Sequence, residues 1–134
     1  MRNRDYPWLQ SYVAKNCLAA RIAPPGTATR VPVRRGSIAE WLRFLPLLEG
    51  RPPVLLYNGR EKNNQTAQHA VVELDVGRRN LQQCADAVIR LRAEYLYSRG
   101  LDRRIKFRYT SGDWVGFSRR QRGERPVVRG NHVS

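Results

Sequence analysis

Residues 81–100 read LQQCADAVIRLRAEYLYSRG, and their pattern predicts the longest helix of the chain. Asn80 is a favoured helix-capping residue, and Gln83 stands three residues later, at the capping-box position. Gly100 is placed to end the helix, so we expect it to span residues 81–99. One face carries side chains at the three-to-four spacing of an amphipathic helix, namely Leu81, Cys84, Ala85, Val88, Leu91, Arg92 and Tyr95. This face needs an apolar partner.

Strand-like segments lie on both sides of this helix. Before it, residues 54–57 form an apolar run that ends in the turn signal Asn58-Gly59, and residues 70–76 alternate between apolar and acidic side chains. We expect these two segments to pair as antiparallel strands. After the helix, residues 105–109 alternate apolar and basic side chains, and residues 110–112 turn the chain. The sequence therefore predicts an α+β fold in which a small antiparallel sheet packs on one long helix.

One or two short helices are expected nearer the N-terminus. Residues 8–20 carry a loose apolar stripe that is compatible with a helix. Residues 29–33 look extended, as at the edge of a sheet. Ser37 and Glu40 have the spacing of a capping box, which predicts a short helix over residues 38–44.

The length of 134 residues is that of one domain. We expect an N-terminal segment at residues 1–23, an α+β domain at residues 24–112 and a basic, poorly ordered tail at residues 113–134. Within the tail, Val127-Val128 is expected to add a last strand around a turn at Gly130-Asn131. No apolar run approaches the roughly 18 residues that cross a bilayer, and the first residues lack the apolar stretch of a secretory signal.

The charge balance favours anionic partners. The chain has 25 Lys and Arg against 11 Asp and Glu, a formal net charge of +14. Such a charge suits nucleic acid, anionic lipid head groups or acidic cell-wall polymers. The excess lies towards both ends, since residues 51–98 are nearly balanced. Almost all basic residues are arginine, which suits bidentate phosphate recognition but also follows from GC-rich codon usage.

Aromatic side chains interleave with the basic residues after the long helix. Phe107 and Tyr109 are expected to face the core, which leaves Trp114 and Phe117 free to stack on bases. The predicted polyanion-binding residues are Arg103, Arg104, Lys106, Arg108, Arg119, Arg120, Arg122 and Arg125.

Cysteine and histidine are scarce and scattered. Cys17 and Cys84 allow at most one disulfide, so no disulfide framework is expected. Together with His69 and His132 they lack the close ligand spacing of a structural zinc site. Neither a metal nor another cofactor is predicted.

Cys84 is the candidate nucleophile of the chain. It lies in the first turn of the predicted long helix, where free amide groups favour the thiolate that attacks substrates. His69, at the entrance to the segment 70–76, is the candidate base. The alternative is a structural role, because Cys84 falls on the apolar face and free cysteines are often buried.

Seven segments of the chain carry a family pattern: residues 36–43 (GSIAEWLR), 45–47 (LPL), 56–60 (LYNGR), 69–72 (HAVV), 75–77 (DVG), 81–97 (LQQCADAVIRLRAEYLY) and 107–112 (FRYTSG). Together they resemble a bacterial family classified as domain of unknown function 4846. The helix segment is long enough to be specific. The resemblance covers residues 21–112, which correspond to the N-terminal half of the family only.

The resemblance implies a possible origin for the chain. Family members are longer and often exported, and a later segment has a Gly-His-Ala tripeptide entering an apolar strand. A cysteine at a helix start followed by a histidine on a later strand is similar to the order in papain-like cell-wall peptidases. By that analogy Cys84 is the nucleophile, and the base comes from a C-terminal half that this chain lacks.

Two functions therefore stay open at this point. The first is a truncated family member derived from a papain-like cysteine hydrolase, inactive on its own, with a cell-wall polymer as its partner. The second is a basic module that binds nucleic acid or another polyanion. Compartment and oligomeric state do not follow from the sequence.

Overall fold

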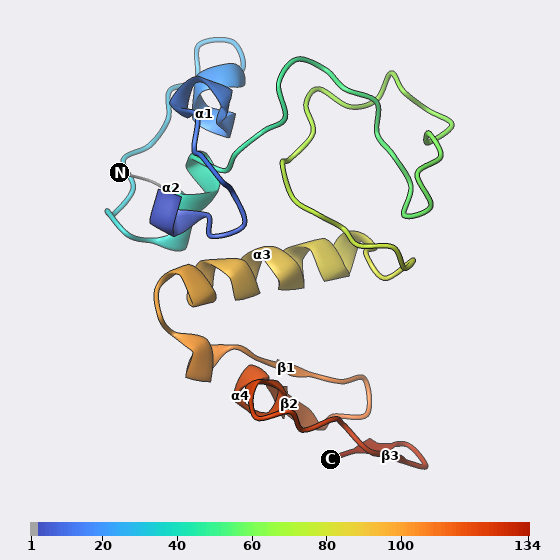
Figure 1. Ribbon diagram of the computed structural model, residues 1–134. Coiled ribbons are helices and arrows are strands. Elements are labelled where there is room, and N and C mark those ends of the chain that lie inside the picture. The colour runs from blue at the N-terminus through green and yellow to red at the C-terminus, as the bar shows by residue number, and fades with distance from the viewer. Residues whose placement is uncertain (1–2) are drawn as a thin grey trace. The chain divides into compact units, whose positions relative to one another are not determined.

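The computed structural model describes residues 3–134, which fold into two compact units (Figure 1). The first unit ends at Asp86, and the second unit comprises Ala87–Ser134. Within the described range, no helix combines the length and apolar character that a membrane crossing requires.

An aromatic cluster forms the centre of the first unit. Tyr6 and Trp41 are fully buried, and their ring centroids lie 5.2 Å apart. The Tyr12 ring stacks on Tyr6 at 5.3 Å. The Tyr6 hydroxyl donates to the Trp41 carbonyl at 2.7 Å, and the Trp41 indole donates to the Asp5 carbonyl at 2.6 Å. The cluster thus buries apolar rings while it satisfies their polar atoms.

The helices of the first unit are short: η1 at Asn3–Asp5, η2 at Ala14–Asn16, α1 at Leu18–Arg21 and α2 at Ile38–Arg43. The capping box of α2 forms as predicted. Ser37 Oγ accepts a hydrogen bond from the Glu40 amide at 3.2 Å, and the Glu40 carboxylate accepts one from the Gly36 amide at 2.7 Å. The predicted short helix at this position is therefore confirmed.

The predicted helix over residues 8–20 is wrong, because only η2 and α1 form within it. Long-range contacts prevent a continuous helix. The Trp8 indole donates to the Glu73 carbonyl at 2.6 Å, and Cys17 forms an antiparallel bridge with Pro46. Cys17 consequently has an extended backbone where the predicted helix would run.

The two segments predicted to pair before the long helix do not pair with each other. Leu55 forms an antiparallel bridge with Glu61, across the predicted turn, and Val72 forms one with Leu47. The turn signal is therefore correct, but it folds the first segment back onto the loop that follows. Residues 29–33 also form no strand.

Helix α3, Cys84–Ser98, is the one helix longer than six residues in the described range. It begins later than predicted, because Asp86 accepts a hydrogen bond from the Gln83 amide at 2.9 Å and so caps the first turn. Its predicted end is confirmed. Gly100 has a φ of 65°, and the amides of Gly100 and Leu101 donate to carbonyls of the last turn at 2.9 Å.

The apolar face predicted for α3 is exposed in its first turns. Leu81, which precedes α3, is 67% exposed and Val88 is 68% exposed, whereas Leu96, which lies off the predicted face, is only 4% exposed. Within the second unit, the last turns of α3 contact the start of α4, where the rings of Tyr97 and Phe117 meet edge to face at 6.2 Å.

The second unit continues with η3 at Asp102–Arg104, β1 at Lys106–Arg108, β2 at Trp114–Gly116, α4 at Phe117–Gln121, β3 at Val128–Arg129 and β4 at His132–Val133. β1 pairs with β2 and β3 with β4, both antiparallel. The turns at residues 110–112 and 130–131 lie where they were expected. The chain is thus α+β, with two separate antiparallel hairpins in place of the single small sheet that was predicted.

Candidate functional site

The exposed face of the β1–β2 hairpin gathers two cations and an indole ring. Strand alternation leaves Lys106 and Arg108 exposed while Phe107, between them, is half-buried. The strand register sets Arg108 opposite Trp114, which is 59% exposed. The Lys106 ammonium lies 5.7 Å from the centre of the Trp114 ring, within the range of a cation–π contact. We name Lys106, Arg108 and Trp114 the basic–aromatic face.

A tight turn holds Arg108 in place on this face. The Tyr109 amide donates to the Asp113 carbonyl and the Gly112 amide to the Tyr109 carbonyl, both at 2.9 Å. Arg108 Nε donates to the Gly112 carbonyl at 2.8 Å. Gly112 has a φ of 94°, and a Cβ at this position would lie 3.4 Å from the Arg108 guanidinium. The positive backbone angle therefore favours glycine at this position.

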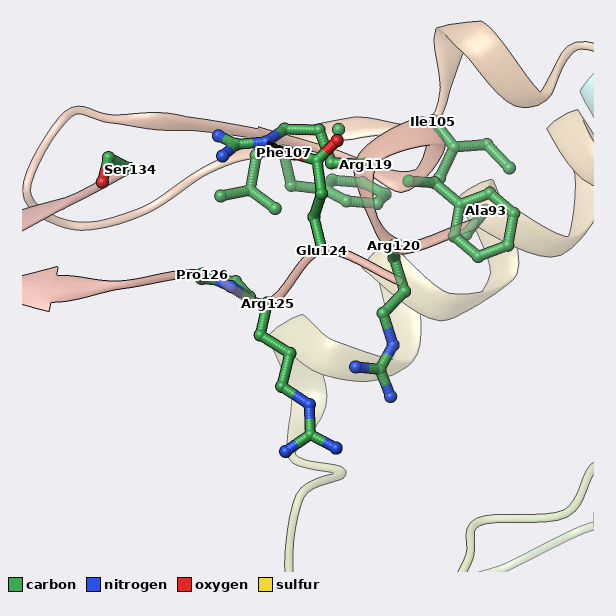
Figure 2. Close-up of a pocket in the computed structure, with 12 residues that line it drawn as sticks. Ala93, Ile105, Phe107, Arg119, Arg120, Glu124, Arg125, Pro126 and Ser134 are labelled. Atoms are coloured by element: carbon green, nitrogen blue, oxygen red, sulfur yellow. Dashed lines mark hydrogen bonds and ion pairs between the residues drawn. The ribbon is translucent and has the colours of Figure 1, made fainter. Parts of the chain in front are cut away.

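The opposite face of the hairpin lines an apolar pocket. Phe107 and Val115 are register partners, and together with Ile105 and Phe117 they line a cavity of about 300 Å³ (Figure 2). Two sequence predictions for aromatic residues are wrong. Tyr109, expected in the core, is exposed, and Phe117, expected to be free, is half-buried against Tyr97.

The remaining predicted arginines fall into three groups. Arg119 and Arg122 both pair with Glu124, at 2.7 and 2.8 Å, and their hydrogen bonds hold the pKa of Glu124 below its usual value. Arg120 and Arg125 line the apolar pocket. Arg103 and Arg104 line a separate, open hollow. The structure thus brings the predicted residues into one unit but not onto a single face.

Residues 18–134 match a family described as a domain of unknown function (4846). The chain belongs to this family. The match extends beyond residue 112, where the resemblance in sequence motifs ends, so the whole β1–β2 hairpin and α4 lie within the family domain. No curated protein and no solved structure matches the sequence.

The candidate catalytic pair belongs to the first unit of the family domain. Cys84 is the first residue of α3 and is exposed, and His69 is exposed in a segment without regular structure. No hydrogen bond joins the two side chains within the described part of the chain. Cys17, in contrast, is buried. The roles of Cys84 and His69 stay predictions.

Residues 3–134 contain no group of three or more side chains that could hold a metal ion.

The structure also reveals a carboxylate that sequence reasoning missed. Asp113 accepts hydrogen bonds from the Ser111 hydroxyl and from the Val133 amide, both at 2.8 Å, and lies 3.4 Å from His132 Nδ1. It therefore joins the β3–β4 hairpin to the β1–β2 turn. No local signal indicates this, because the partners are 20 residues apart.

The contact between the two hairpins is expected to fail in acid. The hydrogen bond from Val133, followed by that from Ser111 and the charge of His132, lowers the pKa of Asp113 from its usual 3.8. A lowered carboxyl pKa stabilises the folded form at pH above 3.8, and this stabilisation is lost as the pH falls through the folded-state value. An NMR titration of the Val133 amide should therefore show its transition below pH 3.8.

The matched variant for this titration is Asp113→Asn, which removes the charge and keeps the shape. It should weaken the contact at neutral pH and abolish the acid transition of the Val133 amide, because no titrating acceptor is left. A transition that persists in this variant would assign the effect to another carboxylate.

Proposed function

We propose that the second unit of this family domain binds single-stranded nucleic acid through the basic–aromatic face. One observation carries the proposal: the exposed Trp114 ring has the Lys106 ammonium 5.7 Å from its centre and Arg108 as its cross-strand partner. Single-strand binding proteins combine the same two elements, aromatic platforms for bases and cations for the backbone.

The charge of the second unit supports this proposal. Residues 87–134 contain 12 Lys and Arg against 4 Asp and Glu, a net charge of +8. One of these acids, Glu124, is already paired with two arginines. The cations of the basic–aromatic face have no acidic partner among the described residues. Their charge is thus available for phosphate groups.

An exposed indole favours nucleic acid over other polyanions. Acidic cell-wall polymers and heparin offer negative charge and sugar rings but no planar bases, so they lack the base stacking that Trp114 offers. Bases stack on aromatic side chains whatever their sequence. We therefore expect affinity without strong sequence preference.

The experiment is a salt titration of oligothymidylate binding to the full chain, measured by fluorescence anisotropy. The logarithm of the affinity should fall linearly with the logarithm of the salt concentration, by about 0.7 for each phosphate contact to a single strand. The double variant Lys106→Gln/Arg108→Gln should weaken binding and reduce this slope by roughly 0.7 for each lost contact.

The matched control is Arg34→Gln/Arg35→Gln, which removes the same charge from two exposed arginines of the first unit. This control should leave the slope nearly unchanged. Equal effects of the two double variants would mean that net charge, and not the basic–aromatic face, determines binding. Salt-independent binding would also reject the proposal.

A second candidate is that the chain derives from a papain-like cysteine hydrolase, with Cys84 as nucleophile. Within this chain, His69 is the separate candidate for a base. The observation in its favour is that Cys84 is exposed and begins a helix of 15 residues. Thiol nucleophiles are commonly activated at helix N-termini or by a neighbouring histidine. The rate at which Cys84 reacts with an alkylating agent tests this candidate.

A further inference from the structure

The apolar pocket of the second unit has features of a ligand site that differ from those of the basic–aromatic face. Its volume of about 300 Å³ lies at the lower end of the range of roughly 300–1,000 Å³ found for small-molecule sites. Its apolar wall comes from four elements or their flanks. Ala93 lies in α3, and Val115 lies in β2. Ile105 immediately precedes β1, Phe107 lies in β1, and Phe117 begins α4.

Three arginines are among the residues that line this pocket. Arg119, Arg120 and Arg125 line it and are exposed to solvent. Arg119 is bound to Glu124 at 2.7 Å. Within the described residues, Arg120 and Arg125 form neither an ion pair nor a side-chain hydrogen bond. Figure 2 shows both side chains extending in the same direction, away from the Glu124 carboxylate.

The single acid at the pocket does not offset these free arginines. Glu124 accepts hydrogen bonds from Arg119 at 2.7 Å and from Arg122 at 2.8 Å, so its charge is already compensated. The pocket lining therefore includes two arginines without an acidic partner among the described residues, next to an apolar interior. A ligand that complements it needs an apolar body and an anionic head group.

We propose that the second unit binds a small amphipathic anion, with its apolar body between Phe107 and Phe117 and its head group at Arg120 and Arg125. The shared chemistry is a short acyl or alkyl chain that ends in a carboxylate or a phosphate. The guanidinium fork binds either head group through paired hydrogen bonds. This site uses the face of the β1–β2 hairpin opposite to Trp114 and is independent of nucleic-acid binding.

The test is an NMR titration of the full chain with four probes that share an eight-carbon chain: octanoate, octyl phosphate, 1-octanol and octyltrimethylammonium. We expect the anions to bind about tenfold more tightly than octanol, since hydrogen bonds between charged groups are the stronger class. Shifts should be centred on the amides of Ala93, Phe107 and Val115. The ratio between octanoate and octyl phosphate identifies the preferred head group.

Two variants locate the interaction. Arg120→Gln/Arg125→Gln should remove the preference for anions, while Arg103→Gln/Arg104→Gln removes the same charge elsewhere and should preserve it. Ala93→Leu should fill the cavity and abolish binding of octanoate and octanol alike, with circular dichroism reporting whether the fold is retained. Trp114→Ala should leave octanoate binding unchanged.

Three results would overturn the proposal. They are equal affinities for octanoate and octanol, an unchanged anion preference in Arg120→Gln/Arg125→Gln, and shifts that centre outside the pocket. If the unmodified chain binds octanoate but not oligothymidylate, the proposed nucleic-acid function alone is rejected.

Discussion

Replacing Trp114 with alanine is expected to weaken oligothymidylate binding by the full chain about tenfold. Stacking of a base on an aromatic side chain contributes about 1–3 kcal/mol, and every 1.4 kcal/mol corresponds to a factor of ten. Trp114 is the exposed ring of the basic–aromatic face, and its loss also removes the cation–π partner of Lys106. Fluorescence anisotropy with a labelled oligothymidylate measures the change.

Trp114→Phe is the control, because it keeps an aromatic platform at the same position. It should retain most of the affinity that alanine loses. NMR shifts of the Val115 amide report whether the β1–β2 hairpin survives either substitution. If Trp114→Ala binds as well as the original chain while Lys106→Gln/Arg108→Gln does not, the ligand is a polyanion held by charge alone, and the nucleic-acid proposal fails.

Alkylation of the native chain with iodoacetamide is expected to modify Cys84 and spare Cys17. Cys84 is exposed, whereas Cys17 is only 2% exposed and reacts only when its surroundings open. An opening that costs about 3 kcal/mol would slow the reaction of Cys17 roughly 100-fold. Mass spectrometry of the modified peptides against time gives both rates.

The same experiment decides on the second candidate function. In urea both cysteines should react at similar rates, which supplies the reference for an unactivated thiol. Native Cys84 that reacts faster than this reference supports an activated nucleophile, and His69→Ala should then reduce its rate. Native Cys84 that reacts no faster rejects the hydrolase candidate. Equal native rates for Cys84 and Cys17 would contradict the burial of Cys17.

Several elements follow from short-range signals and could be predicted. The capping box starts α2 because Ser37 and Glu40 lie within one turn of each other. Gly100 ends α3 because glycine readily adopts a positive φ. The turns of both hairpins likewise depend on glycine, with φ values of 94° at Gly112 and 59° at Gly130.

Other elements depend on contacts between residues that are distant in the chain, and local patterns did not predict them. The contact of Trp8 with Glu73 joins residues 65 positions apart and interrupts the helix expected over residues 8–20. The segment at residues 54–57 has the composition of a buried strand, but Leu55 pairs with Glu61 instead of the segment 70–76. Strand propensity indicates that a segment can pair, and only tertiary contacts select its partner.

The amino-acid sequence by itself determined the family, the positive charge and the alternation that exposes Lys106 and Arg108. Tertiary structure alone decided that Lys106 lies over Trp114, that Glu124 pairs with two arginines, and that Arg120 and Arg125 line an apolar pocket. The physical reason is that a charge acts according to the groups beside it in space. Those neighbours are set by strand register and by packing, which local patterns do not encode.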